Sequence, residues 1–455
     1  MDSKHFDVII IGSGPGGYQA AAHAAREGLS VCIAEESEAG GTCLNRGCIP
    51  TKALCHDAEL ARMAAATTAC TPDATAMQAR FAEAMSRKAE VVAQLRSGVE
   101  SLLAAPGITL VRGRAQLLAD ATVQTPEGCL TADNIIIATG SRSAMPPIAG
   151  LDLPGVVTST GMLDTTTLPS RLCIVGAGVI GLELAGVFSS FGTKVTVVEF
   201  MRECLSAMDS DIAKRLRKQM ERAGIAFELG TAVKRIDEGL RVTIEKKGRE
   251  AVIEADMVLV ATGRVPRLDA IDTEGLHIAT HRRGICVDAT TFEVVREEGA
   301  QTPASPRIFA IGDVNGCQML AHAAEAQARR VVNTIMGRCD GMRLDVMPAA
   351  VFTTPEAACV GPTDEALKAR GAAFRVYKAT FRANGRALCI GQTEGLVKVI
   401  TDEHDRLLAC HAVGPHAASI VQELTAYIAL GATLRQLLDT VHIHPTLSEV
   451  LLSLA

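Results

Sequence analysis

The stretch VIIIGSGPGG at residues 8–17 decides the fold of the first part of the chain. A continuous apolar run meets a glycine abruptly, as expected for a buried parallel strand that ends at a tight turn before a helix. Gly12, Gly14 and Gly17 stand where a dinucleotide-binding fold needs a tight turn, close approach of a pyrophosphate and close packing of the helix. Glu35 lies 23 residues beyond Gly12, where a carboxylate can accept hydrogen bonds from ribose hydroxyls. Together they predict a dinucleotide site, whereas a glycine turn that serves only helix packing is the alternative.

The same pattern recurs in LCIVGAGVIG at residues 172–181. Gly176, Gly178 and Gly181 repeat the three glycine positions, and Glu199 again lies 23 residues beyond the first of them. A carboxylate there favours NAD, because NADP carries a 2′-phosphate that an arginine would have to meet. Two such motifs predict two different bound dinucleotides.

Each copy of the motif is followed by an apolar run that ends in Ala-Thr-Gly, at residues 134–140 and 257–263. An internal repeat of this kind predicts two doubly wound α/β domains, each with a parallel, Rossmann-like sheet. From about residue 342 the pattern is absent. A strand-like run at 396–400 and a helix-like run at 419–430 predict a third domain there, of the α+β class.

The composition is that of a globular protein without a strongly charged partner. Hydrophobic residues make up 48%, and 45 basic against 51 acidic residues give a formal net charge of -6 with no basic block. No apolar run approaches the roughly 18 residues that a membrane span requires, and residues 1–7 lack the order of a signal peptide. We therefore expect a cytoplasmic protein that binds neither nucleic acid nor membrane.

Two of the 14 cysteines differ from the others in their surroundings. Cys43 and Cys48 lie within GGTCLNRGCIPTK at residues 40–52, flanked by glycines and a proline just before a helical run. A helix amino end and the nearby Lys52 favour the thiolate, so a pair that cycles between dithiol and disulfide is chemically reasonable. The alternatives are a metal pair, which would need further Cys or His ligands, and two buried thiols. We expect no metal, and we expect most of the other cysteines to be buried thiols within apolar runs.

These motifs resemble those of the pyridine nucleotide-disulfide oxidoreductases and, within that family, the branch that oxidises dihydrolipoamide. The resemblance covers essentially the whole chain and implies FAD at the first glycine turn and NAD at the second. Its motifs are the turns at 12–17 and 176–181, the segment 40–52, IFAIGDV at 308–314 and HPTLSE at 444–449. The implied domains are an FAD-binding segment at 1–146, an NAD-binding domain at 147–268, a second FAD-binding segment at 269–341 and a dimerisation domain at 342–455.

The resemblance also implies roles for the residues around the cysteine pair. Cys43 and Cys48 would form a redox-active disulfide, with Cys48 nearer the flavin. Lys52 would lie beside the flavin and pair with Glu183, a residue that is otherwise interpreted as an ordinary solvated position on a helix.

The nucleotide contacts are implied in the same way. Asp313 would accept a hydrogen bond from the FAD ribitol, and the helix that begins near Ala321 would direct its positive end at the isoalloxazine. The implied FAD contacts are Gly12, Gly14, Gly17, Glu35, Lys52, Gly140, Asp313 and Ala321. The implied NAD contacts are Gly176, Gly178, Gly181, Glu199 and Gly263.

His444 and Glu449 lie too far along the chain to belong to the sheet of the first domain. A lone histidine is usually structural, but a histidine with a neighbouring carboxylate can be held in one tautomer as a proton acceptor. The resemblance implies that this pair is catalytic and is delivered by the other subunit of a homodimer. The third domain would form the dimer interface, and the active site would be shared between subunits.

The implied reaction is the oxidation of dihydrolipoamide, carried on a lipoyl domain or a lipoyl carrier protein, with NAD as the final acceptor. His444 takes a proton from the dithiol, whose thiolate attacks Cys43, and the second substrate thiol resolves the mixed disulfide. The nearest alternative is a glutathione reductase or another NAD(P)H-dependent disulfide reductase, but glutathione reductases typically use NADPH, and Glu199 counts against that. From a different class, a structural subunit of a 2-oxoacid dehydrogenase or glycine-cleavage assembly is the alternative, although the intact redox residues argue against it.

Two stretches depart from the family pattern. Arg267 stands where asparagine is common after a Gly-Arg-Val-Pro run, and residues 293–305 resemble a small insertion before the motif at 308–314. Neither departure affects the proposed chemistry.

Overall fold

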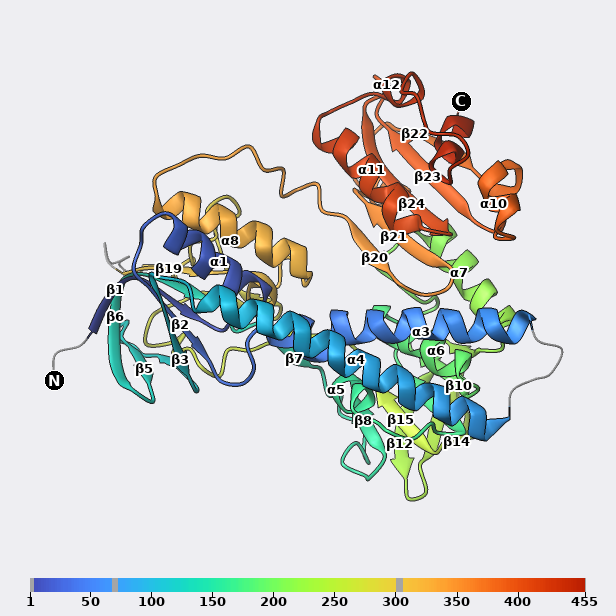
Figure 1. Ribbon diagram of the computed structural model, residues 1–455, viewed down its shortest axis with the longest axis horizontal. Coiled ribbons are helices and arrows are strands. Elements are labelled where there is room, and N and C mark those ends of the chain that lie inside the picture. Colours follow the sequence, from blue (N-terminus) through green and yellow to red (C-terminus); the bar gives the residue numbers. More distant parts are fainter. Residues whose placement is uncertain (1–3, 68–72, 300–305, 455) are drawn as a thin grey trace. The chain divides into compact units, whose positions relative to one another are not determined.

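The computed structural model describes residues 4–67, 73–299 and 306–454 (Figure 1). They form two compact units. The first unit holds the residues up to Pro50, Ser86–Ala144 and Gly263–Leu344, and the second holds Thr51–Met85, Met145–Thr262 and the residues from Asp345 on. Both mix helices and strands, which confirms the predicted fold class. In the described part of the chain, no helix combines the length and the apolar character that crossing a membrane requires.

A seven-stranded sheet forms the core of the first unit. The strands β3, β2, β1, β6 and β19 run parallel in that spatial order, which is the order of a doubly wound nucleotide-binding sheet. The antiparallel strands β5 and β4 extend the sheet from the first half of β6. The bounds are β1 Lys4–Ile11, β2 Val31–Glu35, β3 Ile108–Arg112, β4 Gln116–Leu117, β5 Val123–Thr125, β6 Gly128–Ile137 and β19 Arg307–Ala310.

The central strand β1 is buried on both faces, which explains its continuous apolar run. Val8 and Ile10 contribute to one hydrophobic cluster, which includes residues of α1 and α8, whereas Ile9 and Ile11 contribute to a second cluster on the other face. The alternation follows from the two-residue period of a strand. A parallel sheet covered on both sides therefore forms where the sequence predicts it.

Helices α1 and α8 pack side by side in the first unit (Figure 1). A Cβ atom at Gly16 would lie 3.2 Å from the carbonyl oxygen of Ala324, so the glycine allows the two helices to approach closely. The helices and remaining strands of this unit are α1 Pro15–Arg26, α2 Gly41–Arg46, α8 Ala321–Ile335, the 3-10 helix η1 Gly312–Asn315, β7 Ser141–Ser143, β16 Arg264–Pro266, β17 Thr280–His281 and β18 Gly284–Ile285. Helices α3 (Cys48–Thr67) and α4 (Ala74–Leu103) contribute residues to both units.

The second unit contains a five-stranded parallel sheet in the order β11-β10-β9-β15-β8. Its strands β9, β10, β11 and β15 follow the same sequence-to-space order as β1, β2, β3 and β6, which confirms the internal repeat. The bounds are β8 Val156–Thr158, β9 Arg171–Val175, β10 Lys194–Glu199, β11 Ala226–Leu229 and β15 Met257–Val260, with helices α5 Ser159–Leu163, α6 Val179–Ser190 and α7 Ser210–Arg222. A three-stranded antiparallel sheet adds β12 Ala232–Asp237, β13 Arg241–Lys246 and β14 Arg249–Glu254.

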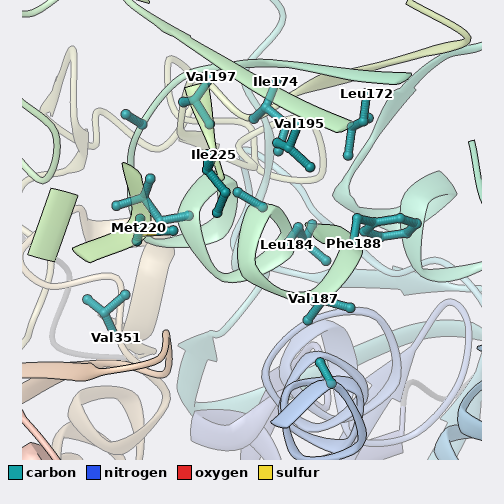
Figure 2. Close-up of a cluster of buried hydrophobic side chains, with 14 of the residues drawn as sticks. Leu172, Ile174, Leu184, Val187, Phe188, Val195, Val197, Met220, Ile225 and Val351 are labelled. Atoms are coloured by element: carbon teal, nitrogen blue, oxygen red, sulfur yellow. The ribbon is translucent and has the colours of Figure 1, made fainter. Parts of the chain in front are cut away.

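The core of this parallel sheet is filled by side chains from its strands and from α6 and α7 (Figure 2). Aliphatic residues dominate, as expected where strands are covered on both faces. The residues labelled in Figure 2 are Leu172, Ile174, Leu184, Val187, Phe188, Val195, Val197, Met220, Ile225 and Val351.

A separate antiparallel sheet in the second unit has the order β20-β21-β24-β23-β22. Helix α11 packs on it, and helix α7 also contacts strands β21 and β24. The bounds are β20 Ala349–Val351, β21 Glu356–Val360, β22 Arg375–Ala379, β23 Leu396–Thr401, β24 Leu407–Gly414, α9 Asp364–Ala369, α10 Gly385–Cys389, α11 Ala417–Ala429, α12 Leu434–Leu438, η2 Phe381–Ala383 and η3 Ser448–Leu454. The α+β character predicted for the last part of the chain is therefore confirmed.

The predicted insertion at residues 293–305 lies only partly within the described residues. Glu293 forms a bridge to Phe309, and Val294 N donates to the carbonyl of Ile308 at 2.9 Å, so its first residues pair with β19. Residues 300–305 lie outside the described part of the chain.

One aromatic cluster ties α4 to α6 within the second unit. The ring of Phe81 lies 5.5 Å from that of Phe188 and 5.4 Å from that of Phe191, and Phe81 is fully buried. We expect Phe81→Ala to lower the free energy of unfolding by about 3–5 kcal/mol, because the cavity cannot close completely. The matched control is Leu95→Ala on the same helix, where the side chain is 43% exposed. Urea unfolding followed by circular dichroism should show a lower midpoint for the first variant alone, and equal midpoints would contradict the prediction.

Candidate active site

The first glycine turn has one position with room for a ligand. Gly12 has a φ of +102°, and a Cβ there would lie 2.5 Å from the carbonyl oxygen of Ala138. A Cβ at Gly17 would lie 1.9 Å from the carbonyl oxygen of Gly12, so both glycines are required by the fold itself. A Cβ at Gly14 would meet nothing within 4 Å, and Gly14 is the N-cap of α1 without a side-chain cap. The open space and the N–H groups of the first turn suit a pyrophosphate.

The second glycine turn repeats this geometry. Gly176 has a φ of +109°, and its Cβ would lie 2.4 Å from the carbonyl oxygen of Ala261. A Cβ at Gly181 would lie 2.1 Å from the carbonyl oxygen of Gly176, whereas a Cβ at Gly178 would meet nothing within 4 Å. Two copies of the turn therefore reserve the same middle position for a ligand.

Glu199 lies at the end of β10 and faces the second turn. Its Oε2 accepts from Ala177 N at 2.6 Å and its Oε1 accepts from Met201 N at 2.7 Å. A carboxylate can accept about four hydrogen bonds, so each oxygen has capacity left for a ribose hydroxyl. The arrangement fits the predicted contact with NAD.

Glu35 occupies the equivalent place at the end of β2. Its Oε2 accepts from Ser13 N at 2.9 Å and Ser13 Oγ at 2.7 Å, and its Oε1 accepts from Ser37 N at 2.9 Å and Ser37 Oγ at 3.2 Å. The hydroxyls of Ser13 and Ser37, which the sequence analysis did not single out, thus fill the hydrogen-bonding capacity of the Glu35 carboxylate. The corresponding capacity of Glu199 is left open. A ribose at Glu35 would replace a hydroxyl donor rather than add one.

The cysteine segment packs directly against the first glycine turn. Cys43 lies in α2 and Cys48 begins α3, and the structure holds them as a near-disulfide pair. A Cβ at Gly41 would lie 2.6 Å from the Cα of Gly14, so the missing side chain lets this segment reach the turn. The amino end of α3 favours negative charge at Cys48.

A side chain that the sequence analysis overlooked fixes the conformation of α2. Asn45 Nδ2 donates to the carbonyls of Ala39 at 2.9 Å and Gly41 at 3.0 Å, and its Oδ1 accepts from Arg96 Nε at 2.8 Å. Such a clamp holds the short helix that carries Cys43. No local pattern indicated the bond to Arg96, which lies 51 residues away.

The expectation that most of the remaining cysteines are buried is wrong. Among the described residues, the fully buried cysteines are Cys32, Cys173, Cys204 and Cys410. Others, such as Cys129 and Cys317, are exposed. They lie near turns at the ends of strands or helices, where flanking apolar residues do not imply burial.

Asp313 lies in η1, a short helix that precedes α8. It accepts a hydrogen bond from Ser141 Oγ, which in turn accepts from Arg264 Nε at 2.7 Å. Arg264 also donates to the Ser141 carbonyl at 2.8 Å. Burial lowers the pKa of Arg264, and Asp313 partly offsets this effect. Asp313 is thus bonded to Ser141, the residue that follows Gly140, and Ser141 is bonded to Arg264. The sequence analysis proposed neither Ser141 nor Arg264.

Helix α8 begins at Ala321, at the place predicted, and its N-cap residue Leu320 provides no side-chain cap. Gln327 of this helix accepts from Gly312 N at 2.8 Å and from Asn315 Nδ2 at 3.0 Å. The helix therefore carries η1, and with it Asp313, at its amino end. This end is suited to stabilise negative charge.

Lys52 and Glu183 are brought together within the second unit. The Lys52 Nζ lies 2.9 Å from Glu183 Oε1 and 2.8 Å from Oε2. Glu183 is only 3% exposed and also accepts from Phe352 N at 2.8 Å. The lysine Nζ lies 5.0 Å from the centre of the Phe352 ring. Glu183 is therefore a buried ion-pair partner, and its interpretation as a solvated helix position is wrong.

His444 and Glu449 also lie side by side in the second unit. Glu449 Oε1 is 2.8 Å from His444 Nδ1, and its Oε2 accepts from Thr446 N at 2.7 Å. The Thr446 N–H and then His444 hold the pKa of Glu449 below its usual value. An ionised carboxylate only accepts, so Nδ1 carries the proton, and in the neutral imidazole Nε2 is left as the acceptor. The imidazole is 79% exposed, which leaves it open to a substrate.

Gly263, a predicted NAD contact, lies in a different unit from the other predicted NAD contacts. Gly263 belongs to the first unit, has a φ of +121°, and its carbonyl accepts from Ala144 N at 2.9 Å. The other predicted NAD contacts belong to the second unit.

The chain belongs to the pyridine nucleotide-disulphide oxidoreductase family. The family model matches residues 6–328, and the model of the family's dimerisation domain matches residues 347–455. The protein is thus a flavoprotein disulfide oxidoreductase that uses FAD and NAD(H), and its dimerisation domain supports a homodimer. The predicted class and cofactors are confirmed.

Particular relatives are similar to this chain over nearly all of its length. Dihydrolipoyl dehydrogenase 3 of Haloarcula marismortui is 38% identical over 467 residues, which cover 99% of this chain and 95% of that protein. Leghemoglobin reductase of Glycine max is 36% identical over 462 residues, with 98% and 86% covered. The solved structure of the HOCl-induced flavoprotein disulfide reductase RclA from Escherichia coli superposes with a TM-score of 0.85 at 30% identity, covering 98% of this chain and 99% of that one.

The open position at Gly178 leads to a test of the second nucleotide site. Gly178→Ala should fold and retain FAD, because its φ of −79° suits alanine and the added methyl meets no atom. We expect its affinity for NADH to fall by about tenfold or more, because the methyl occupies the space of the pyrophosphate. Fluorescence titration with NADH measures this change. Gly186→Ala in the same helix, where a Cβ also meets nothing within 4 Å, is the control. Equal affinities for the two variants would contradict the assignment.

Proposed function

We propose that the protein oxidises dihydrolipoamide to lipoamide and passes the electrons to NAD, with the substrate carried on a lipoyl domain or a lipoyl carrier protein. The observation that carries the proposal is the hydrogen bond between His444 and Glu449, which presents an imidazole nitrogen as a proton acceptor. Curated relatives named dihydrolipoyl dehydrogenase, from an archaeon, a bacterium and plants, support it at 36–38% identity. Glu199 supports NAD as the acceptor.

Proton removal starts the proposed reaction. Nε2 of His444 accepts a proton from one substrate thiol, and Glu449 stabilises the imidazolium that results through Nδ1–H. The pairing with Thr446 keeps the carboxylate ionised and correctly oriented. The thiolate so formed is a far better nucleophile than the thiol.

Thiol–disulfide exchange follows at the cysteine pair. The substrate thiolate attacks Cys43 Sγ, the Cys43–Cys48 bond breaks, and Cys48 leaves as a thiolate. The second substrate thiol then attacks the substrate sulfur of the mixed disulfide, and its proton passes to the leaving Cys43 thiolate. This step forms the ring disulfide of lipoamide and releases Cys43. Two electrons have moved from the substrate to the cysteine pair.

The remaining residues bind and orient. The first turn with Gly14, Glu35 and Asp313 would hold FAD, which when bound supplies hydride transfer between the cysteine pair and NAD. The turn with Gly178 and Glu199 would hold NAD. The proposal keeps for Lys52 and Glu183 the roles that the family resemblance implies.

The proposal includes an active site shared between the two subunits of a homodimer. His444 follows two exposed apolar residues, Val441 and Ile443, which are 95% and 79% exposed in the single chain. Leu430 at the end of α11 is also exposed. Large exposed aliphatic side chains in the domain that carries a reactive histidine are what a docking surface for a second copy would provide.

A second candidate is an NADH-dependent reductase of another disulfide or oxidant. The observation that favours it is the similarity to RclA, whose name describes an HOCl-induced disulfide reductase, and to leghemoglobin reductase. Such an enzyme would use the same cysteine pair in the opposite direction. A structural subunit without catalysis is disfavoured, because no residue of the proposed chemistry is missing.

The substrate proposal is tested by an assay of the purified flavoprotein with dihydrolipoamide and either NAD or NADP. We expect rapid reduction of NAD, slow reduction of NADP, and loss of activity by about 10³-fold or more in Cys43→Ser, because that variant cannot form the mixed disulfide. The control is Cys129→Ser, an exposed cysteine outside the cysteine segment. FAD content reports folding. A protein that holds FAD but does not turn over dihydrolipoamide would exclude the proposal in favour of the reductase.

The shared site is tested by mixing two inactive subunits. Cys43→Ser and His444→Gln chains with different affinity tags are reassociated, and the heterodimer is purified by both tags. If His444 serves the cysteine pair of the other chain, one of the two sites is intact and activity returns to about one half of the wild-type value. A heterodimer as inactive as its parents, with normal FAD content, would show that each chain uses its own histidine.

A further inference from the structure

A buried lysine joins the carboxy-terminal sheet to helix α7. Lys398 lies in β23 and is only 2% exposed. Its Nζ lies 2.6 Å from Asp209 Oδ2 and 2.8 Å from Asp364 Oδ1. Burial opposes the charge, but the hydrogen bonds with both carboxylates outweigh it and raise the pKa of Lys398. The lysine is therefore a fixed ammonium, and its removal would leave the buried carboxylate of Asp209 without a compensating charge.

The carboxylate of Asp209 has two functions at once. Its Oδ1 caps α7 by accepting from Asp211 N at 3.0 Å and Ile212 N at 3.4 Å. Its Oδ2 accepts from Lys398. The start of α7 is therefore attached to β23 through one fully buried side chain.

The chain between β10 and α7, residues 200–209, is here named the β10–α7 loop. It begins immediately after Glu199, the predicted ribose acceptor, and it ends at Asp209. In its middle, Leu205 N donates to the carbonyl of Ala177 at 3.0 Å. Ala177 lies between Gly176 and Gly178 and also donates its own N–H to Glu199. Ala177 is therefore held at its carbonyl by the loop and at its N–H by Glu199.

The backbone at the centre of this loop is strained. Leu205 has a φ of +46°, in the left-handed region that a branched residue rarely adopts, and its side chain is buried. Such a conformation persists only where the surroundings hold it. The bond to Ala177 holds one side of it, and the anchored Asp209, four residues later, holds the other.

We infer that Lys398 is a positioning residue for NAD: by holding Asp209 it sets the β10–α7 loop and, through Leu205, the glycine turn that receives the pyrophosphate. A residue of the dimerisation domain thus takes part in binding the pyridine nucleotide. The inference concerns only the half-reaction with NAD(H), so it does not depend on which dithiol or disulfide is the second substrate.

The other charged groups near Lys398 agree with this role. Oxygens of Asp209, Asp364 and Glu365 lie within 4.8 Å of one another, a grouping that could hold a metal ion, yet the lysine ammonium already bonds to the first two. His411 is the cross-strand neighbour of Lys398 in β24, and burial lowers its pKa. The cation at this place is thus supplied by the chain itself.

The test is reduction of the bound FAD by NADH, followed anaerobically in a stopped-flow instrument. The dependence of the rate on NADH concentration separates the apparent Kd from the limiting rate. For Lys398→Met we expect the apparent Kd to rise by about five- to tenfold, in the range of typical coupling between sites, with an unchanged limiting rate. A loss that is merely structural would lower the limiting rate and the FAD content together.

Two further variants make the test decisive. Lys378→Met is the matched control, because Lys378 is the cross-strand neighbour of Lys398 and pairs with Asp211 at 2.7 Å, but it is half-exposed and does not bond to Asp209. It should keep the wild-type Kd. The double variant Asp209→Asn with Lys398→Met keeps a capping oxygen and leaves no unpaired buried charge, so it should fold even if Lys398→Met does not. We expect it to show the same rise in Kd. Wild-type Kd in a Lys398 variant that holds FAD, or equal effects of Lys378→Met, would overturn the inference.

Discussion

The structure depends on a backbone contact that is possible only without a side chain. In each nucleotide-binding sheet, a glycine at the start of the helix lies so close to the preceding strand end that a Cβ would overlap a carbonyl oxygen, at 1.9 Å for Gly17 and 2.1 Å for Gly181. This contact fixes the helix on its strand and points the first N–H groups into the space left by the middle glycine. The cysteine segment uses the same device where Gly41 meets Gly14. The geometry of both glycine turns and the place of the cysteine segment thus follow from close approaches that only glycine permits.

The carboxylates near the two nucleotide-binding sheets are hydrogen-bonded to nearby donors. In the described part of the chain, the buried carboxylates bond to backbone or side-chain donors, as for Glu183 with Lys52 and Asp209 with Lys398. The carboxylates at the two strand ends each bond to their own glycine turn, Glu35 to Ser13 and Glu199 to Ala177. Glu35 is already surrounded by serine donors, whereas Glu199 is held only by backbone N–H groups. The same local motif can therefore leave different hydrogen-bonding capacity on the carboxylate for a ribose hydroxyl.

The two glycine turns and the carboxylates at the strand ends could be predicted from local sequence patterns. Gly12, Gly14 and Glu35 are separated by spacings that one strand, turn and helix impose, so a single sequence is enough to predict them. Ser141 and Arg264 could not be found in this way, because their partners are distant in sequence, and the same holds for the bond between Asn45 and Arg96. Lys398 offered one signal: a single charge in an apolar strand. A lysine in a strand that is buried on both faces requires carboxylates from elsewhere in the chain. The sequence does not indicate which carboxylates these are.

The two chemical ends of the reaction lie far apart in the order of synthesis. His444 is the 401st residue after Cys43, since 444 minus 43 is 401. At about 5–20 residues per second, the ribosome needs roughly 20–80 seconds to make the chain between them. During that interval the cysteine pair can already fold with the first glycine turn, yet it has no imidazole to accept a proton. Under the proposed mechanism, a nascent chain would therefore contain its cysteine pair well before it contains its own proton acceptor.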